Sequence, residues 1–283
     1  MSKIIALANQ KGGTAKTTTA VNLAAYLAAL GKSTLLVDLD PQSNTTSSVG
    51  IASPAPEPHI YQALIGQSQA KSIIHQTPIF GFDVIPAGIA LAGALVELTG
   101  LANREFRLYN LLKPIKANYD FILIDTPPSL GLLTLNGLAA CDEVIIPVQC
   151  EYLALEGIAQ LLETVNLINK NLKKNIKVLG ALLVMYDRMS RLNRAVAKEM
   201  RRNFPGYIFN AVIPRNISLA EAPSFGKTIL QFAPYSHGAK AYRQLAQEII
   251  NLENPCPTTL SAADSNRLSP RKIYESESPN RLI

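Results

Sequence analysis

A short stretch rich in lysine and glycine, residues 10–19, constrains the fold of this chain more than any other part of its sequence. It reads QKGGTAKTTT and lies between an apolar, β-branched run, 4–8, and an Ala- and Leu-rich stretch, 20–28, with helical spacing. A buried strand, a glycine-rich turn and a helix start, in this order, are the context of a phosphate-binding loop. We therefore expect the backbone N–H groups of the turn and the positive end of the helix dipole to bind phosphates.

Side chains of this loop match the chemistry of a bound nucleoside triphosphate. Lys16 is the expected point charge for the β- and γ-phosphates, and the Thr17 hydroxyl is the expected Mg²⁺ ligand. The loop therefore predicts a nucleoside triphosphate bound together with Mg²⁺. A basic surface turn is the alternative, but the flanking strand and helix favour the phosphate loop. The expected nucleotide-binding residues of the loop are Lys11, Gly12, Gly13, Thr14, Ala15, Lys16, Thr17 and Thr18.

The loop departs from the standard pattern Gly-x-x-x-x-Gly-Lys-Ser/Thr in two places. Lys11 precedes the glycines, and Ala15 occupies the position of the second motif glycine. With Lys11, the stretch resembles the deviant Walker A motif of the ParA/MinD superfamily, usually KGGxGK followed by Thr or Ser. In that family the first lysine reaches the nucleotide of a partner subunit, which implies catalytic roles for both Lys11 and Lys16. Alanine is the smallest side chain that can replace the glycine, so we still expect a functional loop.

Two carboxylates stand at the end of the second predicted strand, 33–40. Strand–helix–strand units of this kind predict a largely parallel sheet. Alternation puts Asp38 and Asp40 on one side of the strand, near the sheet edge where ligands bind. The segment DLDPQSN resembles DLDPQGN of ParA proteins, which implies that Asp38 contacts the nucleotide–magnesium region and that Asp40 positions the attacking water. Two solvated carboxylates at a strand end are the alternative.

A third acidic residue, Asp125, ends the apolar run in the stretch YDFILIDTPP, 119–128. Four apolar residues followed by aspartate are typical of a Walker B strand, whose carboxylate holds Mg²⁺ through water. The following Thr-Pro-Pro resembles the ParA/MinD switch that senses the γ-phosphate. A buried strand with a capping aspartate is the alternative, and the upstream phosphate loop favours the metal site.

The region 187–215 is strongly basic for a chain whose formal net charge is only +6. Several of its cations recur at three- and four-residue steps, which predicts one charged helix face. A solvated helix face is the usual explanation of such a pattern, but ParA proteins bind DNA without sequence preference through basic residues of their C-terminal half. The resemblance therefore implies DNA contacts by Arg188, Arg191, Arg194, Lys198, Arg201, Arg202 and Arg215.

A fourth match to the family follows at 212–227, which resembles the ParA/Soj string IPRN…SEAPSxGKPI. In that family the Pro–Arg–Asn turn borders the adenine base, which implies nucleotide contacts by Pro214 and Asn216. In the less informative region 50–100 we expect a strand at 82–87 and a helix from about Leu91. His59 and His75 are expected to be ordinary surface residues.

These patterns predict an α/β fold: a three-layer, mostly parallel twisted sheet with helices on both faces, of the P-loop NTPase, deviant Walker A type. The expected domains are an ATPase domain, 1–252, and a flexible C-terminal tail, 253–283, rich in Pro, Ser, Asn, Arg and Glu. We expect no signal peptide and no membrane span. Cys141, Cys150 and Cys256 show no paired metal-ligand spacing, and an odd number of cysteines in a chain without a signal sequence predicts reduced cytoplasmic thiols.

The resemblance implies a magnesium-dependent ATP hydrolase that forms an ATP-bridged homodimer, binds nucleoid DNA in the cytoplasm and is stimulated by a ParB-like or adaptor (McdB-like) protein. The cargo would be a plasmid, a chromosome or, as the Thr14-Ala15 departure suggests, a carboxysome-like compartment of the McdA branch. A MinD-like membrane ATPase is an alternative, but residues 272–283 offer no sustained apolar face. A nitrogenase-reductase-like iron–sulfur protein would need other cysteine spacing. A biosynthetic ligase is not expected to carry the arginine-rich helix.

Overall fold

The computed structural model of the protein describes residues 2–52, 55–151 and 154–253. The chain divides into two compact units, Met1–Glu248 and Ile249–Ile283. Of the second unit only 249–253 are described, as the end of helix α11 (His237–Glu253). The tail expected over 253–283 thus lies outside the described residues except for Glu253, and its boundary stays a prediction.

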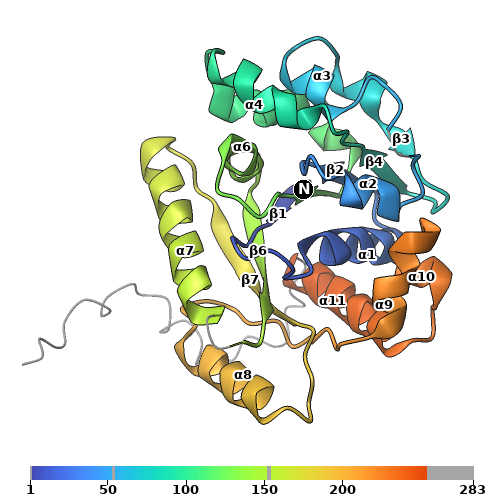
Figure 1. Ribbon diagram of the computed structural model, residues 1–283, viewed down its shortest axis with the longest axis vertical. Coiled ribbons are helices and arrows are strands. Elements are labelled where there is room, and N and C mark those ends of the chain that lie inside the picture. The colour runs from blue at the N-terminus through green and yellow to red at the C-terminus, as the bar shows by residue number, and fades with distance from the viewer. Residues whose placement is uncertain (1, 53–54, 152–153, 254–283) are drawn as a thin grey trace, which may run out of the picture. The chain divides into compact units, whose positions relative to one another are not determined.

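A seven-stranded sheet with the order β3-β4-β2-β5-β1-β6-β7 forms the centre of the first unit (Figure 1). Every neighbouring pair of strands is parallel except β3 with β4. Strands buried on both faces need almost continuous apolar sequence, which the central strands have. The mostly parallel α/β fold is therefore confirmed. The strands are β1 (Lys3–Leu7), β2 (Thr34–Asp38), β3 (His75–Gln76), β4 (Phe82–Ile85), β5 (Phe121–Asp125), β6 (Glu143–Gln149) and β7 (Lys177–Val184).

Helices cover both faces of this sheet, which gives the three expected layers (Figure 1). Helix α1 (Lys16–Ala29) lies on one face, and α6 (Leu132–Ala140) and α7 (Ala154–Asn171) lie on the other. Successive residues of β1 pack on opposite faces of the sheet. Ile4 belongs to the large apolar cluster on the α6–α7 side, and Ile5, which is also buried, points to the other face. The remaining α-helices are α2 (Asn44–Ser48), α3 (Ile60–Leu64), α4 (Leu91–Thr99), α5 (Arg107–Leu112), α8 (Arg191–Asn203), α9 (Ile217–Glu221) and α10 (Ile229–Phe232), and 3₁₀ turns lie at Ala70–Ile73, Arg104–Phe106, Lys116–Asn118 and Ala222–Phe225.

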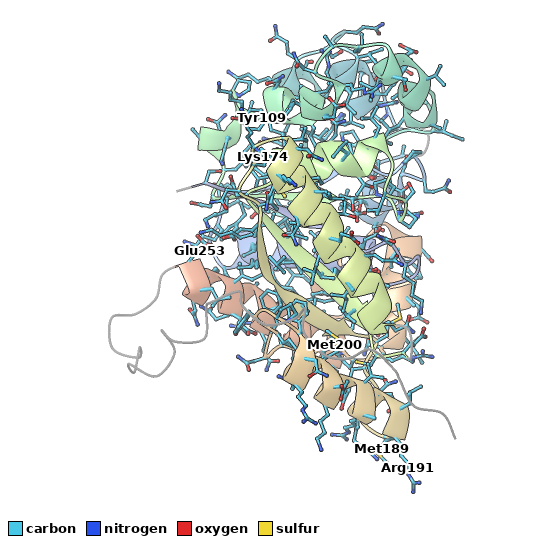
Figure 2. All side chains as sticks on the ribbon, turned by 90° about the vertical axis from the view of Figure 1, so that its left-hand side faces the viewer. Tyr109, Lys174, Met189, Arg191, Met200 and Glu253 are labelled. Atoms are coloured by element: carbon cyan, nitrogen blue, oxygen red, sulfur yellow. The ribbon has the colours of Figure 1, made fainter. Side chains whose placement is uncertain are left out.

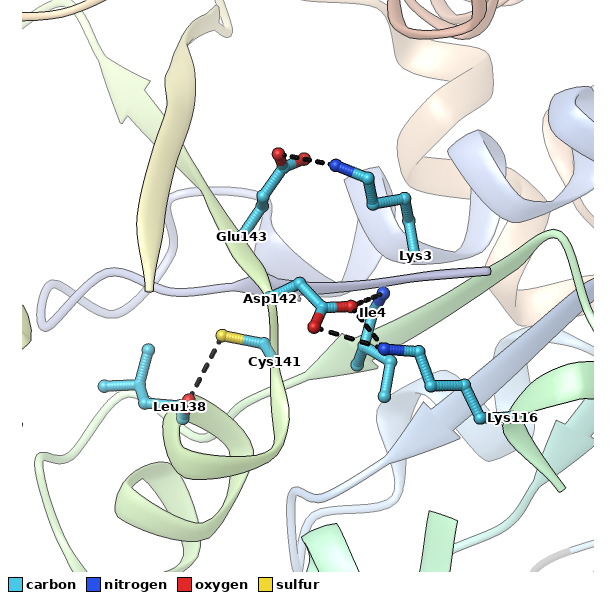
Figure 3. Close-up of polar contacts among 7 residues, drawn as sticks. All are labelled: Lys3, Ile4, Lys116, Leu138, Cys141, Asp142 and Glu143. Carbon is cyan, nitrogen blue, oxygen red and sulfur yellow. Dashed lines mark hydrogen bonds and ion pairs between the residues drawn. The ribbon is translucent and has the colours of Figure 1, made fainter. Parts of the chain in front are cut away.

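Charged residues at the amino end of the sheet fix β1 beside β6 (Figure 3). Lys3 pairs with Glu143 at 2.9 Å. Asp142 accepts a 2.9 Å hydrogen bond from the backbone N–H of Ile4 and pairs with Lys116 at 2.8 Å. The phosphate loop follows the carboxyl end of β1. Asp142 and Glu143 therefore lie at the opposite end of the strands, where they have structural partners.

The strand β4 and the helix α4 lie where the sequence predicted them. The expectation for His59 was wrong, because only 3% of this side chain is exposed. His59 is the N-cap of α3: its Nδ1 accepts a hydrogen bond from the N–H of Tyr61 at 3.3 Å, and its own N–H donates to Oε1 of Gln62 at 3.0 Å. Helix capping explains a buried histidine that stands in a polar sequence.

Candidate nucleotide-binding site

The loop between β1 and α1 has the backbone of a phosphate cradle. Gly13 has φ +74°, which suits a residue without Cβ. Ala15 also lies in the left-handed region, with φ 56° and ψ 31°, immediately before the first residue of α1. Added Cβ atoms at Gly12 and Gly13 would meet no described atom within 4 Å, so the space in front of these glycines is open to a ligand. Helix α1 begins directly after this loop, and the free N–H groups of a first helical turn bind anions.

Lys16 lies inside this loop with only 7% of the residue exposed. Its ammonium donates to the backbone oxygens of Asn9 at 2.9 Å and Lys11 at 3.3 Å. Burial lowers the pKa of Lys16, and the charges of Asp125 and Asp40 oppose that shift. Asn9, which sequence reasoning passed over, anchors the loop by donating to the carbonyl of Pro147 in β6 at 2.7 Å.

Asp125, at the end of β5, is fully buried beside the start of α1. Its Oδ2 accepts hydrogen bonds of 2.7 Å from the hydroxyls of both Thr17 and Thr45. Its Oδ1 is buried as well and has no hydrogen-bond partner among the described residues. Burial raises the pKa of Asp125 to about 6, and the bonds from the two threonines act against that shift.

Asp38 and Asp40 take different positions although they are two residues apart. Asp38 is fully buried, and its carboxylate accepts from the N–H and hydroxyl of Thr46, at 2.9 and 2.6 Å, and from the N–H of Asp40 at 3.1 Å. Burial raises the pKa of Asp38 to about 7, and the neighbouring charge of Asp125 adds to this shift. Asp40 is partly exposed and accepts from the N–H of Gln42 at 2.9 Å.

Lys11 lies on the outside of the loop and forms an ion pair with Glu151, just beyond β6. Both side chains are almost half exposed, at 45% and 44%. Lys11 therefore points away from the glycines of its own loop. Thr14 is buried and donates to the carbonyl of Lys11 at 3.2 Å, which shapes the turn from inside.

An apolar cavity of about 310 Å³ opens beside the start of α1. It brings the residues expected at the adenine, Pro214 and Asn216, next to Ala15 and Thr18 of the phosphate loop. Asn216 also caps α9, because its Oδ1 accepts from the N–H of Leu219 at 3.2 Å. The other residues of the lining are Met185, Ile213, Arg215, Leu219, Ala220 and Tyr242.

The basic residues expected at DNA divide between α8 and its surroundings. Five of the seven lie on α8, where they are exposed, and Ala197 and Met200 form the buried side of this helix. Figure 2 shows Arg191 at the outer end of α8 and Met200 nearer the sheet. Arg188 precedes the helix, while Arg215 lies apart from it and lines the cavity. Arg194 has a structural task too, because its guanidinium donates to the Arg188 carbonyl at 2.7 Å.

The protein atoms fit Mg²⁺ held together with a nucleotide. Mg²⁺ in phosphate sites takes few protein ligands and keeps waters and phosphate oxygens around it. The Thr17 hydroxyl and the unpartnered Oδ1 of Asp125 supply hard oxygen atoms of that kind. Across the part of the chain that the structure describes, there is no cluster of three His, Cys, Asp or Glu that could hold a metal independently of a nucleotide.

None of the described helices combines the length and apolar character that crossing a membrane requires.

Known proteins resemble the chain in sequence and structure. Residues 2–178 match a family described as an AAA domain. The sporulation initiation inhibitor protein Soj of Bacillus subtilis is 51% identical over 249 residues, covering 88% of this chain and 98% of Soj. The chromosome partitioning protein ParA of Myxococcus xanthus is 46% identical over 255 residues, 90% of each chain. A cobyrinic acid a,c-diamide synthase from Mycobacterium smegmatis, solved with ADP and magnesium, superposes with a TM-score of 0.79 at 35% identity, covering 90% of this chain and 96% of that one.

These likenesses extend beyond the phosphate loop to almost the whole of the described chain. They agree with its fold and, because the synthase has also been solved with an ATP analogue and magnesium, with ATP and Mg²⁺ as cofactors. The chain therefore belongs to the ParA/MinD superfamily of P-loop ATPases, with Soj and ParA proteins among its relatives.

Proposed function

We propose that this protein is a ParA-type positioning ATPase whose ATP-bound dimer binds non-specific DNA and whose hydrolysis releases it. The main support for ATPase activity is that Lys16, Thr17 and Asp125 lie together at the carboxyl ends of the strands. An apolar cavity large enough for a base lies beside them. Ligands bind in parallel α/β sheets at this edge.

Each residue of the site has a role that follows from its position. Lys16 exchanges its contacts with loop carbonyls for the β- and γ-phosphates, and Thr17 and Asp125 hold Mg²⁺, Asp125 through water. When bound, Mg²⁺ supplies neutralisation of the charge that develops on the phosphate oxygens. Asp40 is partly exposed and close enough to Lys16 to affect its pKa, so it orients the attacking water at the γ-phosphate. Asp38 fixes the segment that carries Asp40.

The base binds in the cavity, and the dimer forms through Lys11. Pro214 and Asn216 border the adenine there, with Ala15 and Thr18 on the opposite side. Lys11 projects outward from the loop, where a partner subunit's phosphates can replace Glu151 as its counter-charge. Two subunits then enclose the two nucleotides, and the dimer exists only while ATP is present.

DNA binds across α8. Its exposed cations need only phosphate oxygens as partners, so binding is independent of sequence and weakens with salt. Two basic faces in a dimer double the number of phosphate contacts, which makes DNA binding depend on ATP. In the cell this predicts a cytoplasmic protein associated with the nucleoid.

The cargo is a chromosome or plasmid region in this proposal, because the relatives at 51% and 46% identity include a chromosome partitioning protein. A ParB-like partner would stimulate hydrolysis. A protein compartment with an McdB-like adaptor is the other cargo class, indicated by the Thr14-Ala15 sequence in the loop.

Variants at Asp40 and on α8 test the two halves of the proposal separately. Asp40→Ala should keep the ATP-dependent dimer but lower ATP turnover at least about tenfold, since it removes the group that orients water. Arg191→Gln with Lys198→Gln should weaken binding to random-sequence duplex DNA and leave turnover without DNA unchanged. Lys71→Gln with Lys113→Gln, an equal loss of charge at other exposed sites, is the matched control. Equal DNA affinity of both double variants would contradict a DNA face on α8.

A biosynthetic synthase is the second candidate, because a solved structure of that name is 35% identical. ATP turnover that requires a small carboxylic acid, and that DNA and dimer formation do not affect, would favour it. The basic face of α8 has no task in such a reaction.

A further inference from the structure

Two neighbouring threonines in the short helix α2 bind two different buried carboxylates. Thr45 is 0% exposed and Thr46 is 1% exposed, and both lie within α2. The Thr45 hydroxyl contacts Asp125, and the Thr46 hydroxyl contacts Asp38. Neither threonine was singled out from the sequence, because such contacts depend on the tertiary structure.

The Thr45 hydroxyl donates to Asp125 Oδ2 at 2.7 Å, the same oxygen that accepts from Thr17 at 2.7 Å. Two donors on one oxygen fix the rotation of the carboxylate. The other oxygen, Oδ1, is buried and has no hydrogen-bond partner among the described residues. Its lone pairs are therefore available to a ligand. Buried polar atoms are almost always satisfied, and an exception at such a place indicates a missing cation or its bound water.

Thr46 has a different environment. Its hydroxyl donates to Asp38 at 2.6 Å and accepts from the N–H of Ala87 at 2.9 Å, and its own N–H donates to Asp38 at 2.9 Å. All three bonds join α2 to β2 and to the segment after β4. Thr46 therefore holds the helix in place through Asp38 and Ala87, whereas the contact with Asp125 belongs to Thr45.

We propose that Thr45 is a positioning residue of the metal site, which acts through Asp125. By holding Oδ2 together with Thr17, it presents Oδ1 to Mg²⁺ or to a water bound to it. Because Thr45 belongs to the segment that begins with Asp40, the same bond couples the orientation of the metal carboxylate to the place of Asp40. This role rests on the proposed nucleotide–magnesium site and adds a residue to it. Groups that orient metal-binding side chains typically contribute 10–100-fold in metal affinity.

The test is the magnesium dependence of nucleotide binding, measured without turnover. A fluorescent, non-hydrolysable ATP analogue is titrated into wild type, Thr45→Val, Thr45→Ser and Thr46→Val, first in EDTA and then across Mg²⁺ concentrations. Thermal unfolding without nucleotide or metal reports the stability of each variant. Valine has the shape of threonine but no donor, whereas serine keeps the hydroxyl.

Thr45→Val should raise the Mg²⁺ concentration for half-maximal binding by about tenfold or more, with affinity in EDTA unchanged. Thr45→Ser should remain within about twofold of wild type on the same scale. Thr46→Val should lower the melting temperature and leave the Mg²⁺ midpoint where it is. If Thr45→Val does not fold, the serine and alanine variants replace it, because serine alone should keep the wild-type midpoint.

A wild-type Mg²⁺ midpoint in Thr45→Val, or an equal shift in Thr46→Val, would overturn the role of Thr45. In either of these cases wild-type binding is intact, so the proposed nucleotide site stands. Wild-type protein that binds the analogue equally with and without Mg²⁺ would overturn the metal site and the role of Thr45 together.

Discussion

The ammonium of Lys11, in the phosphate loop, forms an ion pair with the carboxylate of Glu151, just beyond the end of β6 in the same chain. Both groups are almost half exposed, and ion pairs of this kind contribute only about 0.2–1 kcal/mol to stability. A pair this weak is readily exchanged for another counter-charge. Glu151 therefore holds Lys11 in a position that it can leave at little cost.

Glu151→Gln should raise the fraction of dimer at a given ATP concentration, because it removes the competitor for Lys11. Its melting temperature should stay within about 3 °C of wild type, given the small value of the pair. Lys11→Ala should bind ATP as a monomer. Light scattering coupled to size exclusion, with and without ATP, measures both effects. ATP-dependent dimers in Lys11→Ala would show that another residue bridges the subunits.

Ala15→Gly should stabilise the protein. Ala15 has φ 56° and ψ 31°, a left-handed conformation that costs an L-residue roughly 1–2 kcal/mol. Because glycine makes the unfolded chain more flexible, it lowers the free energy of unfolding by about 0.5–1 kcal/mol. We therefore expect Ala15→Gly to raise the free energy of unfolding by about 0.5–1 kcal/mol on balance. Ala28→Gly, inside α1, should instead cost about 1 kcal/mol. Urea unfolding followed by circular dichroism measures both, and a lower stability of Ala15→Gly would refute strain at this position.

Gly226→Ala should destabilise the protein by roughly 1–3 kcal/mol, because overpacking at a positive φ cannot relax easily. A Cβ at Gly226, where φ is +60°, would lie 2.9 Å from the Cα of Gly50, which follows the end of α2. Gly93→Ala is the control, since its Cβ meets no described atom within 4 Å and it lies within α4. That substitution should stabilise by about 0.5–1 kcal/mol. Equal denaturation midpoints of the two variants would disprove a close approach of Gly226 to Gly50.

Cys141 and Cys150 should resist alkylation in the native protein at neutral pH. Both are buried; burial, reinforced by the charge of Asp142, raises the pKa of Cys141 to about 12, and burial raises that of Cys150 to about 11. The reactive thiolate is therefore scarce and shielded. Peptide mass spectrometry after iodoacetamide treatment should find both thiols unmodified until urea unfolds the chain. Rapid labelling of Cys150 in folded protein would mean that the segment before Glu151 opens.

Local sequence patterns predicted the elements that are formed by one continuous segment. The phosphate loop, the end of β5 and the basic helix are such segments, because their residue types and the periodicity of their apolar or charged residues indicate their secondary structure. The fold class followed, since alternating strands and helices leave few arrangements of a parallel sheet.

Contacts between distant segments were not predictable in this way. Thr45 meets Asp125 across 80 residues, Asn9 meets Pro147 across 138, and Lys11 meets Glu151 across 140. Such pairs depend on which strands become neighbours, and no local period encodes that. A charge pattern also could not show that Arg194 bonds to the Arg188 carbonyl, because it gives residue types and not the backbone conformation before α8.

Binding of the wild-type protein to random-sequence duplex DNA, with ATP, with ADP and without nucleotide over a salt series, tests the proposed function most directly. Binding should require ATP and fall steeply as salt rises, with a slope that reflects several phosphate contacts on α8. Equal DNA binding in all three nucleotide states, or none in any of them, would contradict a dimer that carries DNA only while ATP is bound.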